Sequence, residues 1–312
     1  MGVWGTGLYS GDFPLDLRSA ISAVCRLPLD PDELVNALCD TEPGAAFNES
    51  DEDHSTFWLL LADQLAKRGI ASAHARDRAL AIIDTGADLE THRRRGMPAP
   101  VLARRQKLLL ELRHRLAAMP SQTRPRNVLK KPQPYLMEIG DVIAYPTSAG
   151  KPINPYITPG KERSTGPLAW SHDGWSAFLI VDRGRAFDFL TWYTPIVAVH
   201  AVPEKPVLSA LEQPDVVWTL KNPGTCSPVH FKRMRLEPLA NLAVDSSRLR
   251  ELFPEMRPGH SQAISDISIS NRLTAGTSAR PYPLAPFGVP AKLARGLHRP
   301  LLGIRQILQH RD

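Results

Sequence analysis

One stretch rich in β-branched and aromatic residues, from Tyr135 to Ala201, most constrains what this chain can fold into. It begins YLMEIGDVIAYPT and closes on DGWSAFLIVDRGRAFDFLTWYTPIVAVHA. Such residues favour strands because they fit a pleated, half-buried surface. The connections between the strand candidates are too short for crossover helices, which favours antiparallel pairing. The stretch therefore predicts a curved sheet or a small barrel.

Further segments belong to the same domain. AFLIVDRGRAFDFLTWY predicts two strands joined by a turn at Asp182 to Gly184, because Asp and Gly favour tight hairpin turns. IVAVHAV, DVVWTL and PVHFKRMRLEPL are additional strand candidates, and SSRLRELFPE predicts a short helix. We expect the β-rich domain over residues 135–255 and an irregular tail over 256–312, in which KLARGLHRPLLGIRQILQH is a candidate amphipathic terminal helix.

The chain before Tyr135 has helical periodicity instead. Start and stop signals for helices recur: Asp30 with Pro31, the acidic group at 51–53, and the terminators Gly69 and Gly86. From Pro100 to Met119, leucines form one stripe and arginines occupy much of the remainder. Four or five amphipathic helices joined by short loops predict an all-α domain over residues 1–119.

Residues 120–134, PSQTRPRNVLKKPQP, separate the two patterns. They hold four prolines and four basic residues with few apolar ones, which predicts an extended linker. A chain of 312 residues is long enough for two domains. The sequence therefore predicts an α+β fold, with an N-terminal helical domain followed by a mainly antiparallel β domain and an irregular C-terminal tail.

The cysteines favour a reducing compartment. Cys25, Cys39 and Cys226 form no CxxC pair, and an odd number leaves one unpaired in any disulfide scheme. No window approaches the ~18 uninterrupted apolar residues that a membrane helix needs, and the N-terminus lacks a basic segment followed by an apolar run. We therefore expect a cytoplasmic protein that is neither secreted nor inserted into a membrane.

The charge distribution is lopsided. Residues 1–53 carry eleven acidic side chains against two basic ones, whereas residues 91–131 carry twelve basic ones against one acidic one. This asymmetry marks either a nucleic-acid surface or an acidic face that packs near a basic one. In the first case, the side chains that would contact phosphates are Arg104, Arg105, Arg113, Arg124, Arg126, Lys130 and Lys131.

No catalytic residue, metal or cofactor is assigned, because HExxH, CxxC and GxSxG motifs are absent from the chain. His172 and Asp173 could form an acid/base pair. Neighbours on a strand or turn point apart, however, and Asp-Gly favours a turn at the rim of the sheet. Cys226 with nearby His230 is a weaker pair, and a loop cysteine of ordinary reactivity is the preferred explanation.

The glycine-rich segment GTGLYSG completes neither the dinucleotide nor the Walker pattern, and no strand precedes it. We expect its glycines to permit tight turns while Trp4 and Tyr9 pack against helices.

The aromatic residues of the strand-rich stretch have two interpretations. Beside Lys151, Lys161, Arg163 and Arg183 they could stack nucleic-acid bases. They could equally form the core of the sheet, with exposed members serving a protein interface. The second interpretation is preferred, because nothing resembles the RNP aromatics. The candidate binding residues are Tyr156, Trp170, His172, Asp173, Trp175, Trp192 and Tyr193.

Two segments resemble known families. MGVWGTGLYSGDFPLDLRSAI resembles the M-G-x-W-G-x-G-x-Y opening of a family of uncharacterised bacterial proteins. FWLLLADQLAKRG and ALAIIDTGADLE resemble its continuation, so the resemblance covers residues 1–119. IGDVIAYPTSAGKPINPY is similar to the G-D-V strand of immunity-like barrel proteins from bacterial toxin and conflict systems. By analogy, these resemblances imply a bacterial cytosolic protein that binds another macromolecule.

These observations favour a non-enzymatic, macromolecule-binding protein of a bacterial conflict, immunity or stress system. The expected partner is a protein, and the expected binding face is the aromatic set between Tyr156 and Tyr193. Nucleic-acid association through the basic helix and linker is the first alternative. A hydrolase-like site near His172, oriented by His200 or His230, is the second.

Overall fold

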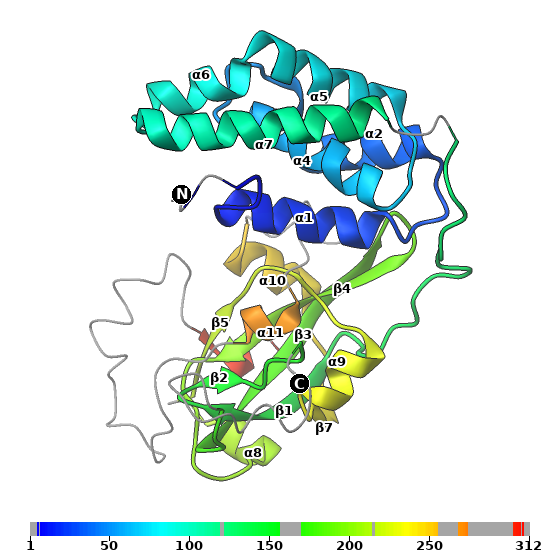
Figure 1. The fold of residues 1–312 in the computed structure, drawn as a ribbon. Coiled ribbons are helices and arrows are strands. Elements are labelled where there is room, and N and C mark those ends of the chain that lie inside the picture. Colours follow the sequence, from blue (N-terminus) through cyan, green and yellow to red (C-terminus); the bar gives the residue numbers. More distant parts are fainter. Residues whose placement is uncertain are drawn as a thin grey trace. The chain divides into compact units, whose positions relative to one another are not determined.

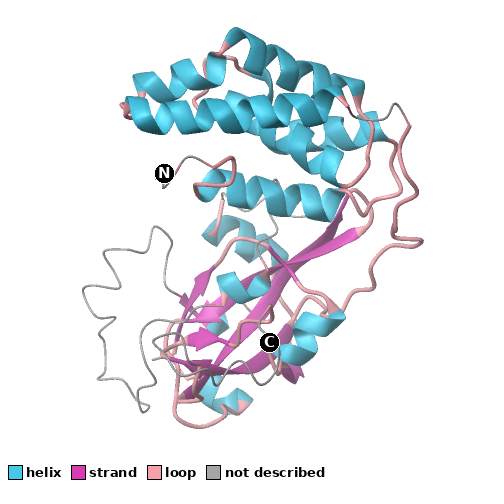
Figure 2. Cartoon of the chain, viewed as in Figure 1, coloured by secondary structure: helices cyan, strands magenta, loops and turns pink. Residues whose placement is uncertain are grey.

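The computed structural model describes residues 5, 7–118, 122–156, 170–213, 216–254, 268–273, 302–306 and 308 of the chain. Contacts divide the chain into two compact units. The helical unit lies within Met1–Lys131, and the sheet unit lies within Pro132–Ser261 and Ile267–Asp312. Helices precede an antiparallel sheet along the chain (Figure 1, Figure 2), so the predicted α+β class is confirmed.

The described part of the helical unit contains seven helices: α1 (Asp12–Val24), α2 (Pro31–Thr41), α3 (Pro43–Phe47), α4 (His54–Lys67), α5 (Ala73–Thr85), α6 (Ala87–Arg94) and α7 (Ala99–Ala117). Asp30 caps α2 as predicted, since its side chain accepts hydrogen bonds from the backbone N–H groups of Asp32 and Glu33. Gly69 and Gly86 follow α4 and α5 with positive φ, as predicted for helix terminators. The short helices α3 and α6 were not predicted.

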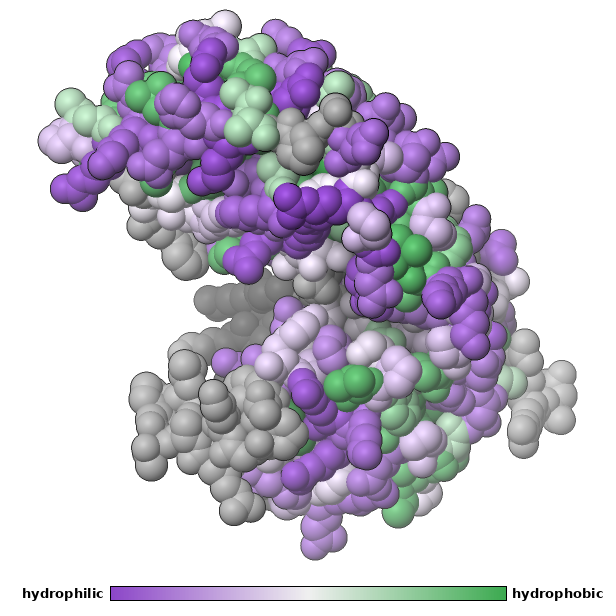
Figure 3. Space-filling model, turned by 45° about the vertical axis from the view of Figure 1, so that its right-hand side comes forward, coloured by the Kyte–Doolittle hydropathy of each residue, from purple (hydrophilic) through white to green (hydrophobic). Residues whose placement is uncertain are grey.

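Helix α4 is the centre of the helical unit. It contacts α1, α3, α5, α6 and α7. Every residue from His54 to Leu65 is buried, which is the pattern of a helix surrounded by neighbours rather than one lying on a surface. The surrounding helices bury one face each, and hydrophilic residues cover most of the helical unit in the view of Figure 3.

The segment predicted as an extended linker is attached to the helical unit over most of its described length. The backbone N–H of Arg124 donates to the Gly69 carbonyl at 2.8 Å, and that of Leu129 donates to the Arg26 carbonyl at 2.7 Å. The Thr123 hydroxyl accepts a hydrogen bond from the Ala71 N–H at 3.0 Å. The segment therefore has irregular backbone but fixed contacts up to Leu129, and the sheet unit begins at Pro132.

The described residues of the sheet unit form eight strands: β1 (Asp141–Ser148), β2 (Lys151–Pro152), β3 (Gly174–Ala186), β4 (Leu190–Ala198), β5 (Val217–Leu220), β6 (Gly224–Thr225), β7 (Glu237–Asn241) and β8 (Leu302–Gly303). The sheet order is β2-β1-β3-β4-β5-β8, with β7 also paired to β1 and β6 to β4. All these strand pairs are antiparallel, as predicted. The sheet is open, so of the two predicted forms the barrel is wrong.

The hairpin between β3 and β4 turns later than predicted. Asp182 to Gly184 lie within β3, and the turn is made by Phe187 and Asp188, which have φ of 50° and 60°. Positive φ at both central residues is the type I′ geometry that matches the twist of two paired strands. Gly184 has another role: a Cβ there would lie 2.4 Å from Cζ2 of Trp192 on the neighbouring strand. This glycine makes room for an indole ring instead of making a turn.

The sheet buries both of its faces. Successive residues of β1, β3 and β4 alternate between two hydrophobic clusters, because side chains along a strand point to opposite faces. One cluster contains Val142, Leu179, Ile196, Trp218 and Phe253, and the other contains Ile143, Tyr145, Phe178, Tyr193 and Ile269. Residues of α8 (Leu208–Leu211) and α10 (Ser246–Leu252) belong to the first cluster, and Ile269 of α11 (Ile269–Arg272) belongs to the second. This double burial explains the uninterrupted apolar runs of the sequence.

Two further predictions change on inspection of the structure. PVHFKRMRLEPL is not one strand: it forms α9 (Pro228–Arg233) and then enters β7. The cause is a strong local start signal, since Ser227 caps the helix by accepting from the His230 N–H and Pro228 occupies its first position. In the predicted terminal helix, Ile304–Gln306 form a 3₁₀ turn, η1, after β8. Leu301 and Ile307 lie outside the described residues.

Among the helices that the structure describes, none is long and apolar enough to cross a membrane.

Replacing Gly184 tests the packing of β3 against Trp192. Gly184→Ala should lower the stability of the sheet unit by about 1–3 kcal/mol, because the new methyl group forces the indole ring from its place. Urea denaturation, with hydrogen exchange of β3 and β4 to localise the effect, measures this change.

Gly44→Ala is the matched control for Gly184→Ala. Gly44 lies in α3, where the nearest atom to an added Cβ is a carboxylate oxygen of Asp51 at 3.3 Å. Alanine is the better helix former, so this variant should be neutral or more stable by up to about 1 kcal/mol. Equal effects of the two substitutions would show that Trp192 imposes no constraint at Gly184.

Candidate functional site

Three aromatic rings follow one another at the start of β3. The rings of Trp170 and His172 are stacked, with centroids 6.2 Å apart and an interplanar angle of 3°. His172 meets Trp175 edge to face at a centroid distance of 5.4 Å. His172 is exposed, and both indole rings are half-buried. We call Trp170, His172 and Trp175 the aromatic face.

Backbone hydrogen bonds fix the aromatic face to the sheet. Trp175 exchanges hydrogen bonds with Val202 in both directions, at 2.6 and 2.7 Å. The Asp173 N–H donates to the Thr147 carbonyl at 3.0 Å, and the Asp173 carboxylate accepts from the Ala149 N–H at 2.6 Å. The segment before β3 is therefore held against the turn between β1 and β2, which makes the ring series a preformed surface.

His172 and Asp173 do not form an acid/base dyad. The Asp173 carboxylate is used by the turn at Ala149, whereas the His172 ring lies between two indoles. Among the described residues, no side chain is hydrogen-bonded to the His172 ring. His230 instead contacts Tyr156, with ring centroids 4.7 Å apart, and His200 is buried. Among the residues that the structure describes, the hydrolase-like alternative therefore has no hydrogen-bonded orienting partner at His172.

The remaining predicted binding residues lie elsewhere. Trp192 and Tyr193 are buried. Trp192 covers Gly184, and the Tyr193 hydroxyl accepts a hydrogen bond from the Leu136 N–H at 2.8 Å. Both belong to the interior of the sheet unit. This agrees with the interpretation of the aromatic residues as the core of the sheet. Tyr156 is exposed and packs beside α9.

Three of the predicted phosphate-contacting residues are held by partners within the helical unit. Arg105 is buried and paired with Asp88, Arg113 is paired with Asp84 at 2.6 Å, and Arg126 donates to the Cys25 carbonyl at 2.9 Å. The exposed members of the set are Arg104, Arg124, Lys130 and Lys131. The structure thus divides the basic set and uses part of it to hold the helical unit together.

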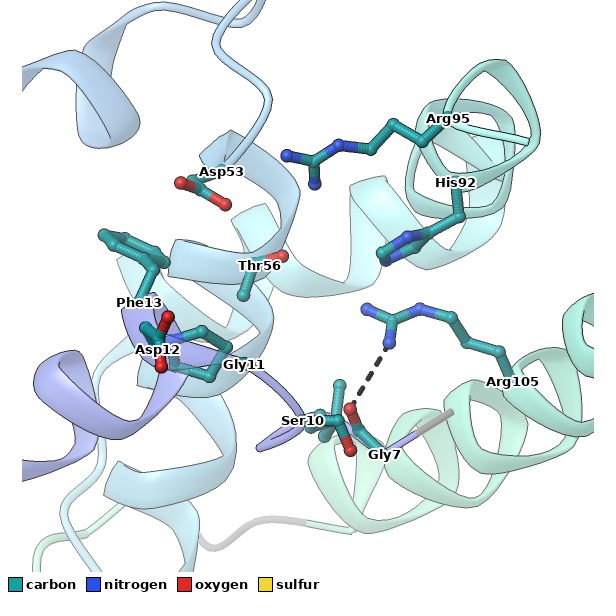
Figure 4. A pocket seen from close by; sticks show the side chains of 12 residues that line it. Gly7, Ser10, Gly11, Asp12, Phe13, Asp53, Thr56, His92, Arg95 and Arg105 are labelled. Atoms are coloured by element: carbon teal, nitrogen blue, oxygen red, sulfur yellow. Dashed lines mark hydrogen bonds between the residues drawn. The ribbon is translucent and has the colours of Figure 1, made fainter. Parts of the chain in front are cut away.

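A second candidate site, which the sequence did not predict, is a pocket inside the helical unit (Figure 4). Its inner part is a cavity of about 30 Å³ between the segment Gly7–Pro14, Thr56 of α4 and Arg105 of α7. Its outer part is a cavity of about 540 Å³ that Glu52, Met97 and Val101 help to line. His92 and Arg95 line both parts, so the two cavities adjoin at these two side chains.

A buried ion pair organises this pocket. Nε and Nη2 of Arg105 donate to the two carboxylate oxygens of Asp88 at 2.6 and 2.7 Å, and these side chains are 3% and 1% exposed. Nη1 of Arg105 lies 3.5 Å from the Gly7 carbonyl oxygen. Asp88 lies on α6 and Arg105 on α7, so the pair joins the two helices and positions the glycine-rich segment.

His92 lies beside this pair without joining it. Its Nε2 is 3.8 Å from Oδ1 of Asp88, beyond hydrogen-bond distance, and its side chain is 6% exposed. Burial, followed by the positive charge of Arg105, lowers the pKa of His92, and Asp88 opposes the shift. The imidazole is therefore neutral at pH 7 and offers one donor and one acceptor.

Opposite charges lie at separate places around the pocket. Burial raises the pKa of Asp53, while Arg95 opposes that shift. Asp53 precedes α4 without capping it by a side-chain hydrogen bond. Arg95 pairs with Glu52, whose side chain is 71% exposed. Figure 4 shows His92 and Arg95 reaching into the pocket from one side and Asp53 from the other.

Tyr9 anchors the N-terminal segment that lines the pocket. Its hydroxyl is hydrogen-bonded to the Asp63 carboxylate, the Gln64 amide and, at 3.2 Å, the Lys67 ammonium. Asp63 also pairs with Arg115 of α7 at 2.7 Å. Burial, followed by the hydrogen bond to Asp63, raises the pKa of Tyr9. Tyr9 therefore packs as predicted for this segment, whereas Trp4 lies outside the described residues.

The described residues contain no group of three or more His, Cys, Asp or Glu side chains that could hold a metal ion. No protein-family model, curated protein or solved structure is significantly similar to the chain. The two sites are therefore interpreted from their own geometry.

Removing one partner of the buried pair should be costly. Asp88→Asn leaves the Arg105 guanidinium buried without a counter-charge, which should lower the stability of the helical unit by about 3–5 kcal/mol. The double variant Asp88→Leu/Arg105→Met removes both charges and should lose less than Asp88→Asn. Urea denaturation of the unaltered protein and the two variants measures these free energies of unfolding. A double variant less stable than Asp88→Asn would contradict the buried-charge explanation.

His92 should make stability depend on pH. Its folded pKa is lowered, so the unfolded chain takes up the proton first. The stabilisation is complete above the unfolded pKa of about 6.5 and is lost as the pH falls from there through the folded pKa. Thermal denaturation between about pH 7.5 and 5 should show the loss in the unaltered protein but less of it in His92→Gln.

The comparison with His92→Gln isolates the contribution of His92 to the pH dependence of stability. Asp53 and Glu42 have raised pKa values, so their contribution to stability increases as the pH falls, opposite to that of His92. Parallel pH profiles of the two proteins would mean that His92 ionises equally well in the folded chain.

Proposed function

We propose that this protein is a non-enzymatic binding protein that contacts a protein partner through the aromatic face. The observation that carries the proposal is the ring series Trp170, His172 and Trp175, with an exposed imidazole between two half-buried indoles. Aromatic side chains supply large contact areas and dominate the energetics of protein interfaces.

The rigidity of the face supports binding. The hydrogen bonds of Trp175 with Val202 and of Asp173 with Ala149 already fix the backbone that carries the rings. A partner therefore orders little of this surface when it binds, which lowers the entropic cost of association. Lys205 adds a positive charge, with its Nζ 5.9 Å from the Trp175 ring centroid.

The contacts of the basic side chains in the sheet unit favour a protein over a nucleic acid. Lys205, beside the face, is paired with Glu237. Arg183, toward the other end of β3, lies over the ring of Tyr135, at 4.0 Å, and pairs with Glu138. Nucleic-acid binding relies on cations that are free to replace counterions along the phosphates. Lys151 is exposed, whereas Lys161 and Arg163 lie outside the described residues.

The cellular setting is part of the proposal. A cytoplasmic location is supported by Cys25, Cys39 and Cys226, which are free and buried. A role in a bacterial conflict, immunity or stress system rests on the resemblance of the opening motif and of the G-D-V segment.

Variants of the aromatic face test the proposal. The tagged full-length chain is incubated with a bacterial lysate, and captured proteins are quantified by mass spectrometry and then titrated in purified form. His172→Ala and Trp175→Ala should each weaken binding of the captured partner by about fivefold or more, because truncating a central aromatic contact typically costs over about 1 kcal/mol.

Phe47→Ala is the matched control for the face variants. Phe47 is an aromatic side chain of the helical unit that is 67% exposed, so its loss removes apolar surface without touching the face. A partner that binds both face variants as tightly as the unaltered chain would overturn the assignment. Equal loss of binding in Phe47→Ala would do the same, since it would indicate general adhesion to apolar surface.

A further inference from the structure

The pocket of the helical unit contains a polar side chain without a hydrogen-bond partner. The His92 side chain is 94% buried, since 6% of its surface is exposed. Within the described part of the chain its ring makes no hydrogen bond, and its Nε2 lies 3.8 Å from Oδ1 of Asp88, beyond hydrogen-bond distance. A buried polar group normally finds a partner. His92 faces a cavity instead (Figure 4), and this arrangement is typical of a group that a ligand completes.

The charges of the pocket identify the chemistry of that ligand. Arg105 is neutralised by Asp88. Arg95 has a mostly exposed partner, Glu52, and exposed ion pairs hold their members weakly. The Asp53 carboxylate accepts no hydrogen bond from the residues that the structure describes. The pocket thus presents an available cation and an available anion at different places.

A ligand with one charge fits this layout poorly. A free anion at Arg95 would add negative charge next to Asp53 and Glu52, and a free cation at Asp53 would be repelled by Arg95. A ligand with both charges neutralises both groups. A neutral imidazole can also donate a hydrogen bond to a carboxylate.

We propose that this pocket binds a small zwitterion of the class of free α-amino acids, with its carboxylate at Arg95 and His92 and its ammonium group at Asp53. The outer cavity, about 540 Å³, has room for the carboxylate and side chain of such a molecule and lies within the usual range of ligand pockets, and Asp53 lines the adjoining inner cavity. Met97, Pro98 and Val101 line it and provide an apolar surface for the ligand's side chain. All these residues belong to the helical unit.

Paired ligands test the charge requirement. The full-length protein is titrated calorimetrically with the twenty common amino acids, and each one that binds is compared with the matching carboxylic acid and the matching amine. At least one amino acid should bind with a dissociation constant below about 1 mM. Its two single-charge analogues should bind at least about tenfold more weakly, because each lacks one charge-assisted contact.

Variants of the charged groups locate the site. Arg95→Gln and Asp53→Asn should each raise the dissociation constant of the amino acid that binds by about tenfold or more. Circular dichroism establishes that each variant is folded. Arg94→Gln is the matched control, since Arg94 is an exposed neighbour of the same charge that hydrogen-bonds Thr91, and it should leave the affinity unchanged.

Three results would overturn the proposal. The first is that no amino acid binds at up to about 10 mM. The second is that a simple carboxylate binds as tightly as the amino acid and that Asp53→Asn leaves its affinity unchanged, which would indicate an anion site. The third is that affinity is the same in both variants, which would place the binding elsewhere. None of these outcomes depends on whether the aromatic face captures a partner.

Discussion

The bidentate ion pair between Asp88 and Arg105 is the interaction on which the pocket of the helical unit depends. Both groups are almost fully withdrawn from water, so each compensates the other's desolvation, and a pair of this kind adds little net stability. What it determines is position. It joins α6 to α7, occupies both oxygens of Asp88, and directs a third donor of Arg105 toward the Gly7 carbonyl. His92 lies beside the pair, and burial, followed by the charge of Arg105, lowers its pKa.

The sheet unit is organised by a different constraint, the burial of both faces. Alternate residues of β1, β3 and β4 enter two separate hydrophobic clusters, so the middle of the sheet has no face available for binding. Polar and aromatic groups can reach solvent only at the ends and edges of the strands. The aromatic face lies at such an end, beside the turn between β1 and β2. Its backbone is fixed there by the hydrogen bond that the Asp173 carboxylate accepts from Ala149 and by those that Trp175 exchanges with Val202.

The sequence predicted those features that depend on neighbours along the chain. Asp30 and Gly86 act within one helical turn, and both were identified. Gly184 was misassigned because its reason is Trp192, across the hairpin. Ser227 with Pro228 was overlooked as a helix start because the residues that follow also suit a strand. Trp170, His172 and Trp175 of the aromatic face were among the predicted binding residues. Trp192 and Tyr193 were predicted with them but are buried in the sheet unit. The pocket could not be predicted, because Arg105 meets Gly7 across 98 positions of the chain.

The lopsided charge of the chain has a structural explanation in the helical unit. Acidic side chains on early segments meet basic ones on later segments, as in Glu52 with Arg95 and Asp63 with Arg115. Where such pairs are exposed they contribute little stability, but they use up charge that would otherwise form a basic surface. Part of the asymmetry is therefore internal complementarity. The exposed positive charge that remains, on Arg94, Arg104, Lys107, Arg124, Lys130 and Lys131, is smaller than the twelve basic residues of 91–131 suggest.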